Sequence, residues 1–202
     1  MFNQLQRQEV RHTDWLMRVI AGSAGGLNLI PPGKGTRPTM DRVKGAIFSS
    51  LGDRIPRARI LDLFAGSGAL GIEALSRGAS SAIFVEHHGP TVALIRRNLK
   101  ATRLEGNVQQ MDAFRYMDLY LGADSLDVIL ADPPYLKHFK GGEENPADAL
   151  LAHASVTKSL GIEGLLVLEC ERRQPLPSLG LWDILSDRNY GESRILILRR
   201  PA

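Results

Sequence analysis

The stretch Asp62-Leu63-Phe64-Ala65-Gly66-Ser67-Gly68-Ala69-Leu70-Gly71 decides the fold class of this chain of 202 residues. It begins inside a β-rich run and ends in an apolar pattern with helical spacing. Gly66 and Gly68 allow a tight turn and let a ligand approach the backbone closely. The helix that follows presents unpaired N–H groups at its start. The stretch therefore predicts a ligand-binding junction between strand and helix, with a purely structural corner as the alternative.

Asp62 indicates which kind of ligand this junction binds. A pyrophosphate would be repelled by a carboxylate on the strand, so an acidic residue four positions before Gly66 favours a ligand that carries a cation. S-adenosylmethionine carries an ammonium and a sulfonium, and its carboxylate can lie at the helix N-terminus. We therefore expect S-adenosylmethionine as the cofactor. The contacts expected from this stretch are Asp62, Phe64, Ala65, Gly66, Ser67 and Gly68.

From Ile60 onward, short β-rich runs alternate with longer helical patterns, which is typical of a parallel sheet with helices on both faces. The predicted strands are Ile60–Phe64, Ser81–Glu86, Asn107–Gln110, Leu126–Ala131 and Leu165–Glu169. The predicted helices are Ala69–Arg77 (ended by Gly78), Pro90–Leu104, Phe114–Leu121 and Pro146–Leu160. Trp182–Ser186 and Arg194–Arg199 have no room for a helix between them, so they should pair antiparallel. Five parallel strands closed by such a hairpin are typical of the methyltransferase variant of the doubly wound α/β fold.

The first 59 residues predict smaller elements. Met17–Leu29 is expected to form a hairpin with Gly25-Gly26 in its turn. Thr39 is expected to be the N-cap of a helix that buries Val43, Ile47 and Leu51. We expect residues 1–16 to be an extension, residues 17–59 to face RNA, and residues 60–202 to form the catalytic domain.

Two further acidic residues stand at predicted strand ends. Glu86 can accept hydrogen bonds from both ribose hydroxyls of the cofactor, although a surface glutamate is the alternative. Asp112 can accept from the adenine amino group, with Ala113 beside the ring. A helix N-cap is the alternative role for Asp112, and both roles are compatible.

The tetrapeptide Asp132-Pro133-Pro134-Tyr135 follows the fourth predicted strand. Its two prolines fix the backbone and remove two N–H donors, so the Asp132 carboxylate and the Pro133 carbonyl face a pocket as acceptors. An exocyclic amine has two N–H donors that these acceptors can bind, while Tyr135 offers a flat face for stacking a base. We therefore predict a catalytic site for base amines, with a structural turn as the alternative.

Charge is distributed unevenly along the chain. Residues 1–59 contain ten Lys and Arg against four Asp and Glu, whereas residues 60–202 contain fifteen against eighteen. A basic front segment fits contact with RNA phosphates, although a solvated face is an equally good reading of charge alone. The expected RNA-binding residues are Arg18, Lys34, Arg37, Arg42 and Lys44.

Other function classes are disfavoured by composition. The longest apolar runs are far shorter than the roughly 18 residues of a membrane span, and residues 1–17 do not resemble a secretory signal. Cys170 is the only cysteine, which excludes an internal disulfide and a cysteine-based zinc cluster and favours a core position on a strand. We expect a cytoplasmic protein without a membrane partner or a metal.

Several motifs together resemble the bacterial 16S ribosomal RNA guanine-N2 methyltransferase family (RsmD type). They are Thr36–Thr39, Asp41–Lys44, Asp62–Gly71, Asp132–Tyr135 and Tyr190-Gly191. The resemblance implies a seven-stranded class I (Rossmann-like) methyltransferase fold with an N-terminal hairpin and helix. It also implies methyl transfer to a guanine amino group of 16S rRNA, in the small ribosomal subunit or an assembly intermediate. Gly45, within a predicted helix, departs from the family pattern and should weaken that helix by up to about 1 kcal/mol.

Three other functions remain open on the sequence. Adenine-N6 methylation of DNA would use the same Asp132–Tyr135 motif. An RNA-binding assembly factor could keep the fold without turnover, and a nicotinamide dehydrogenase is disfavoured by Asp62 and by the closing hairpin.

Overall fold

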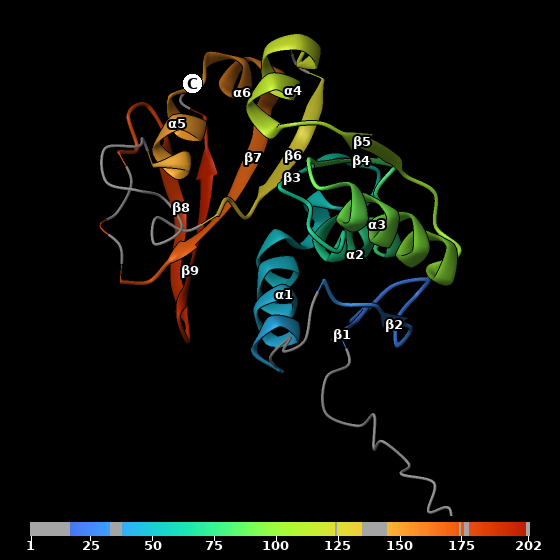
Figure 1. Ribbon diagram of the computed structural model, residues 1–202. Coiled ribbons are helices and arrows are strands. Elements are labelled where there is room, and N and C mark those ends of the chain that lie inside the picture. Colours follow the sequence, from blue (N-terminus) through green and yellow to red (C-terminus); the bar gives the residue numbers. More distant parts are fainter. Residues whose placement is uncertain are drawn as a thin grey trace, which may run out of the picture.

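The computed structural model describes residues 17–32, 38–123, 125–134, 145–173, 175 and 178–200. A seven-stranded sheet with the order β5-β4-β3-β6-β7-β9-β8 forms its centre (Figure 1). The first five of these strands run parallel, and β9 and β8 join antiparallel. The strands are β3 (Arg59–Leu63), β4 (Ser81–Glu86), β5 (Asn107–Gln110), β6 (Leu126–Ala131), β7 (Leu160–Glu171), β8 (Asp183–Tyr190) and β9 (Ser193–Arg199). The predicted α/β class, the parallel strands and the closing hairpin are confirmed.

Alternating apolar residues let each central strand pack on both faces of the sheet. In β3, Ile60 belongs to the hydrophobic cluster on one face and Leu61 to the cluster on the other. In β6, Leu130 and Ile129 divide in the same way. Figure 1 shows α2 and α3 on the first face and α4, α5 and α6 on the second.

The helices mostly follow the predicted ranges. They are α1 (Pro38–Leu51), α2 (Ala69–Ser76), α3 (Gly89–Thr102), α4 (Ala113–Tyr120), α5 (Pro146–Ala152) and α6 (Ala154–Ser159), with a short 3-10 turn at Gly52–Arg54. The single helix predicted over Pro146–Leu160 is wrong, because His153 takes an extended conformation and ends α5. The ring Nε2 of His153 lies 3.1 Å from Asp118 of α4. The predicted end of the helix, Leu160, is instead the first residue of β7.

The closing hairpin is longer than predicted. β8 and β9 remain paired as far as Tyr190 and Ser193, so only Gly191 and Glu192 form the turn. Gly191 has a φ of 60°, a left-handed conformation that suits such a tight connection. The end of this hairpin therefore reaches the same edge of the sheet as the carboxyl ends of the parallel strands.

The predicted N-terminal hairpin is confirmed: β1 (Met17–Arg18) pairs antiparallel with β2 (Asn28–Leu29). The predicted N-cap at Thr39 is wrong, because α1 begins at Pro38; proline suits the first turn of a helix, where its missing N–H is not needed. Val19 and Ile47 lie in the same hydrophobic cluster as Ile60, so this segment shares one core with the sheet. None of the described helices is long and apolar enough to cross a bilayer.

Candidate functional site

The loop between β3 and α2 turns through three residues with positive φ. Phe64 has φ 57°, Gly66 φ 53° and Gly68 φ 78°. Gly68 is needed for packing as well as for the turn, because a Cβ there would lie 3.1 Å from Ile95 in the core. Phe64 is a bulky residue held in a conformation that non-glycine residues rarely adopt, and such strain often accompanies a binding site. The predicted tight turn is thus present.

Asp62 is buried beneath this loop, with 2% of its surface exposed. Its Oδ2 accepts a hydrogen bond from the Gly71 N–H at 2.9 Å, which fixes the first turn of α2. Burial raises the pKa of Asp62 to about 8; the Gly71 hydrogen bond lowers it and the Glu86 carboxyl raises it. The carboxyl is therefore mostly neutral at pH 7 unless a cation lies beside it, so it is not the fixed negative charge that the sequence suggested.

Glu86 ends β4 and bridges two loops. One carboxylate oxygen accepts from the Gly66 N–H at 3.1 Å, and the other accepts from the His88 N–H at 2.8 Å. The side chain is nearly buried, with 8% exposed, and His87 Nδ1 lies 3.3 Å from Oε1. The structure thus places Glu86 beside the loop from Phe64 to Gly68, in a nearly buried position and not on the surface.

Two cavities lie along the carboxyl edge of the sheet. The larger, of about 610 Å³, is bordered by the predicted cofactor residues Glu86, Asp112 and Ala113. The smaller, of about 320 Å³, is bordered by the predicted residues Asp62, Phe64, Ala65, Gly66 and Ser67, and also by residues of α1 and of the β8–β9 turn. Phe64 and Asp132 border both cavities, so the two adjoin there.

The donor set of these cavities fits S-adenosylmethionine. Glu86 offers carboxylate oxygens where ribose hydroxyls need acceptors, and the smaller cavity places carboxyl groups where the cationic end would lie. The Asp112 side chain accepts from the Arg115 N–H at 3.0 Å as N-cap of α4. The structural role considered for Asp112 is therefore present, and its second oxygen remains available for a ligand.

Asp132 follows β6, where the parallel strands end, and is exposed to the cavities, whereas Pro133 is buried. Burial, followed by the carboxyls of Glu169 and Asp62, holds the pKa of Asp132 well above its usual range. Because cavity water reaches this carboxyl, we attribute more of the shift to the neighbouring carboxyls than to burial. Pro134 borders the larger cavity, and Tyr135 lies outside the described residues.

Glu169 is a site residue that sequence reasoning missed. It borders the smaller cavity together with Asp132. β7 pairs with β6 in a register that sets Leu168 beside Ala131, so Glu169, still within β7, comes beside Asp132, which directly follows β6. The signal was available, because Glu169 is the last residue of a predicted parallel strand. The turn residues Tyr190, Glu192 and Ser193 also border this cavity, and only the position of the β8–β9 hairpin reveals them.

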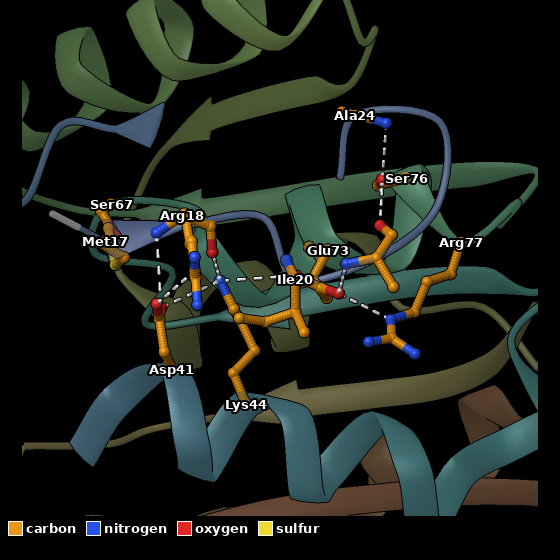
Figure 2. A network of polar contacts seen from close by, with 12 residues as sticks. Met17, Arg18, Ile20, Ala24, Asp41, Lys44, Ser67, Glu73, Ser76 and Arg77 are labelled. Atoms are coloured by element: carbon orange, nitrogen blue, oxygen red, sulfur yellow. Dashed lines mark hydrogen bonds and ion pairs between the residues drawn. The ribbon is translucent and has the colours of Figure 1, made fainter. Parts of the chain in front are cut away.

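Among the predicted RNA-binding residues, Lys44 has a different role. Only 4% of its side chain is exposed, and Nζ donates to the Arg18 carbonyl and lies 3.5 Å from Glu73 (Figure 2). A phosphate cannot reach a buried ammonium, so this assignment is wrong. Arg42 is exposed, and Arg18 is exposed although its Nε lies 3.3 Å from Asp41. Lys34 and Arg37 lie outside the described residues.

Glu73 of α2 holds the N-terminal segment against the sheet layer. This fully buried carboxylate accepts from the backbone N–H groups of Ile20 at 2.7 Å and Ala21 at 3.1 Å. Arg77 Nε also donates to it at 2.7 Å (Figure 2). Ser76, one turn on, donates to the Ala21 carbonyl at 2.6 Å. The hairpin and α1 are therefore fixed to the helix that starts at the cofactor loop.

Comparisons with known proteins agree with this architecture. The sequence pattern of a family described as conserved hypothetical protein 95 matches residues 17–199. The chain is 36% identical over 190 residues to the putative rRNA methyltransferase YlbH of Bacillus subtilis, covering 91% of this chain and 99% of the relative. It is 32% identical over 179 residues to ribosomal RNA small subunit methyltransferase D of Haemophilus influenzae, covering 87% of this chain and 89% of the relative. The solved structure of the putative methyltransferase yhhF from Escherichia coli matches with a TM-score of 0.76 at 30% identity, covering 93% of this chain and 99% of that one.

Proposed function

This chain belongs to the family described as conserved hypothetical protein 95, the RsmD-type family that its motifs resemble, and we propose that it methylates the N2 amino group of a guanine in 16S rRNA. The observation that carries the proposal is the position of Asp132. It stands where the two cavities adjoin, at the end of a central parallel strand and before two prolines. An acceptor at that point can bind a base amine that enters beside the cofactor.

The cofactor is S-adenosylmethionine, and its proposed place follows the two cavities. Glu86 would accept from the ribose hydroxyls, and Asp112 and Ala113 would hold the adenine, since all three border the larger cavity. The loop from Phe64 to Gly68 would hold the methionine part, and Asp62, which borders the smaller cavity, would accept from the ammonium. When bound, S-adenosylmethionine supplies a methyl group that its positively charged sulfur has activated.

Asp132 and the Pro133 carbonyl orient the amine in this proposal. Because both accept N–H groups, they turn the nitrogen lone pair out of conjugation with the base and toward the methyl group. The Asp132 carboxylate also stabilises the positive charge that develops on the nitrogen. Tyr135 is the proposed stacking face for the base. The nitrogen would bond to the methyl carbon as the carbon–sulfur bond breaks and a neutral thioether leaves, and the amine would then lose its proton to water. Holding the two reactants in line would supply most of the rate, and because the leaving group is neutral the step requires no metal.

Ribosomal RNA of the small subunit is the proposed substrate, because the relative from Haemophilus influenzae carries that activity in its name and aligns over 87% of this chain. The cytoplasm, where ribosomes assemble, is the proposed location. Arg18 and Arg42 remain proposed phosphate contacts on the exposed side of the N-terminal segment.

Labelled methyl transfer tests the proposal directly. The protein is incubated with methyl-labelled cofactor and, separately, with naked 16S rRNA, small subunits and DNA, and the labelled nucleoside is identified after digestion. We expect N2-methylguanosine from rRNA or small subunits. N6-methyladenine in DNA would instead assign the alternative activity. Absence of label from all three substrates, while the cofactor binds, would support a non-catalytic assembly factor.

A further inference from the structure

The solvent-facing side of α3, together with the residue that caps its C-terminus, carries four cations that the sequence-level charge count did not single out. They are Arg96, Arg97, Lys100 and Arg103, and all four are exposed. In the part of the chain that the structure describes, none of them has an ion pair or side-chain hydrogen bond with a protein partner. We define these four residues as the α3 basic face.

This face has an unusual composition for a solvated helix. Residues 89–104 contain no Asp or Glu, whereas exposed helices commonly place acids four residues from bases. Arg96 and Lys100 are instead a like-charge pair at that spacing, which destabilises the helix. An arrangement that weakens the isolated fold is explained if an anionic partner neutralises it.

The helix that carries the α3 basic face is tied to the loop that borders the smaller cavity. Asn98, on the buried side of α3, donates to the Ser67 carbonyl at 2.9 Å and accepts from the Ile30 N–H at 2.8 Å. Ser67 belongs to the cofactor loop and borders that cavity. The helix is therefore tied directly to the loop and to the end of the hairpin, and Figure 1 shows β2 beside α3.

The surface of the hairpin beside α3 also suits a nucleic acid. Ile30 and Leu27 are 39% and 42% exposed, and Leu27 borders a small cavity together with Arg103, so apolar area lies beside this cation. Arg96 and Arg103 are seven residues apart, which is about 10 Å along an α-helix and enough for contacts with successive phosphates. Arginine guanidinium groups bind phosphate oxygens in a bidentate manner.

We propose that the α3 basic face binds the sugar–phosphate backbone of the rRNA that flanks the target nucleotide. The inference rests on the proposed function, since it assigns a second contact surface for the same substrate. Together with Arg18 and Arg42, it extends the RNA contact from the N-terminal segment across the hairpin to α3. The binding there is independent of base identity, because phosphates carry no sequence information.

A charge-matched pair of triple variants tests this surface. The test variant combines Arg96→Gln, Arg97→Gln and Lys100→Gln, and glutamine keeps the helix propensity high. The control variant combines Arg115→Gln, Lys158→Gln and Arg188→Gln, which are exposed cations on α4, α6 and β8. Figure 1 shows those elements across the sheet from α3 or at its far end. Both variants lose three charges, so the global charge effect cancels in the comparison.

Binding to naked 16S rRNA is measured from low to moderate salt for wild type and both variants. The slope of log K against log salt should fall by about two units in the test variant and by less than one in the control. Cofactor affinity and melting temperature should equal wild type, and KM for RNA should rise while turnover at saturating RNA persists. Equal slopes in the two variants would overturn the inference.

The outcomes separate this inference from the proposed function. If wild type methylates rRNA but the test variant keeps the full salt slope, only the α3 assignment fails. If wild type modifies DNA and not rRNA, the proposed function itself fails. If the test variant binds naked rRNA normally and loses affinity only for small subunits, the partner of the face is a ribosomal protein and the RNA assignment is overturned.

Discussion

The ammonium of Lys44 lies 3.5 Å from the carboxylate of Glu73, and both side chains are almost fully buried. This pair joins α1 to α2 at the point where backbone N–H groups of the N-terminal segment also bond to Glu73. A buried charge that loses its partner is costly, so the pair has a structural role that a surface cation would not have.

Replacing Lys44 with Met should lower the free energy of unfolding by about 2 kcal/mol, because Glu73 loses one of its charged partners. The salt dependence of RNA binding should stay unchanged. Arg42→Ala is the matched control, since this exposed residue should leave the melting temperature unchanged and flatten the salt slope by about one unit. Thermal melts and salt titrations check both. A Lys44→Met variant that melts like wild type and binds RNA with a reduced slope would contradict the structural assignment.

Replacing Glu86 with Ala should weaken cofactor binding by about 1.5–3 kcal/mol, because the ribose hydroxyls lose a charged acceptor. Glu86→Gln keeps one acceptor oxygen and should lose less. Calorimetry with S-adenosylmethionine measures both, and circular dichroism tests the fold, since Glu86 also holds the loop through Gly66. Unchanged cofactor affinity in Glu86→Ala would show that Glu86 has only a structural role.

Asp62 should make cofactor binding release a proton below pH 8. Its pKa of about 8 means that the carboxyl is protonated at neutral pH, and a nearby ammonium favours the ionised form. Cofactor affinity should therefore rise with pH and level off above about 8. Calorimetry in buffers of different ionisation enthalpy counts the protons. Asp62→Asn keeps an acceptor for the Gly71 N–H, and this variant should release fewer protons when the cofactor binds. If the variant and wild type release equal numbers of protons, Asp62 is excluded as their source.

Asp62 also gives the fold itself a pH dependence. Because its folded pKa lies above the usual value of about 3.9, the unfolded chain loses this proton first as the pH rises. The group should therefore reduce stability between about pH 4 and pH 8. Melting curves across this pH range should show that wild type loses stability relative to Asp62→Asn as the pH rises.

Replacing Asp132 with Ala should lower the single-turnover rate by roughly 100-fold or more, about 2.7 kcal/mol, with RNA affinity changed only a few-fold. Asp132→Asn should keep part of the activity if hydrogen bonding suffices, whereas near-complete loss would implicate the charge. Melting curves identify misfolded variants. A wild-type rate in Asp132→Ala would refute the mechanism.

Glu169 should influence the acidic limb of the pH–rate profile for methyl transfer, which is the pH range in which the rate rises with pH. Asp132 accepts N–H groups best when ionised, so the rate should rise with pH as Asp132 loses its proton. Glu169 and Asp62 raise its pKa, and Asp41, Lys44 and Glu192 border the same cavity. Glu169→Gln should move the limb to lower pH. A limb that stays in place would show that another group controls it.

Patterns within one element predicted the sheet and the cofactor loop well. Ser81–Glu86, Asn107–Gln110 and Leu126–Ala131 are strands with the predicted bounds, and in the first and third an apolar β-rich run marks the strand. The break at His153 was missed, since neither glycine nor proline marks it. The burial of Lys44 depends on Glu73 in another helix, and a count over residues 60–202 hides the α3 basic face among distant acidic residues. The sequence could not show which charged groups lie close together in the folded chain.

The hydrogen bonds of the hairpin also constrain how the chain can acquire its structure during translation. The segment from Ile20 to Ile30 leaves the ribosome early, but it bonds to Glu73, Ser76 and Asn98, which are made later. None of these bonds can form until α2 and α3 have emerged. This earlier segment therefore docks onto helices that are made after it, and its delayed docking completes the wall of the smaller cavity at Met17.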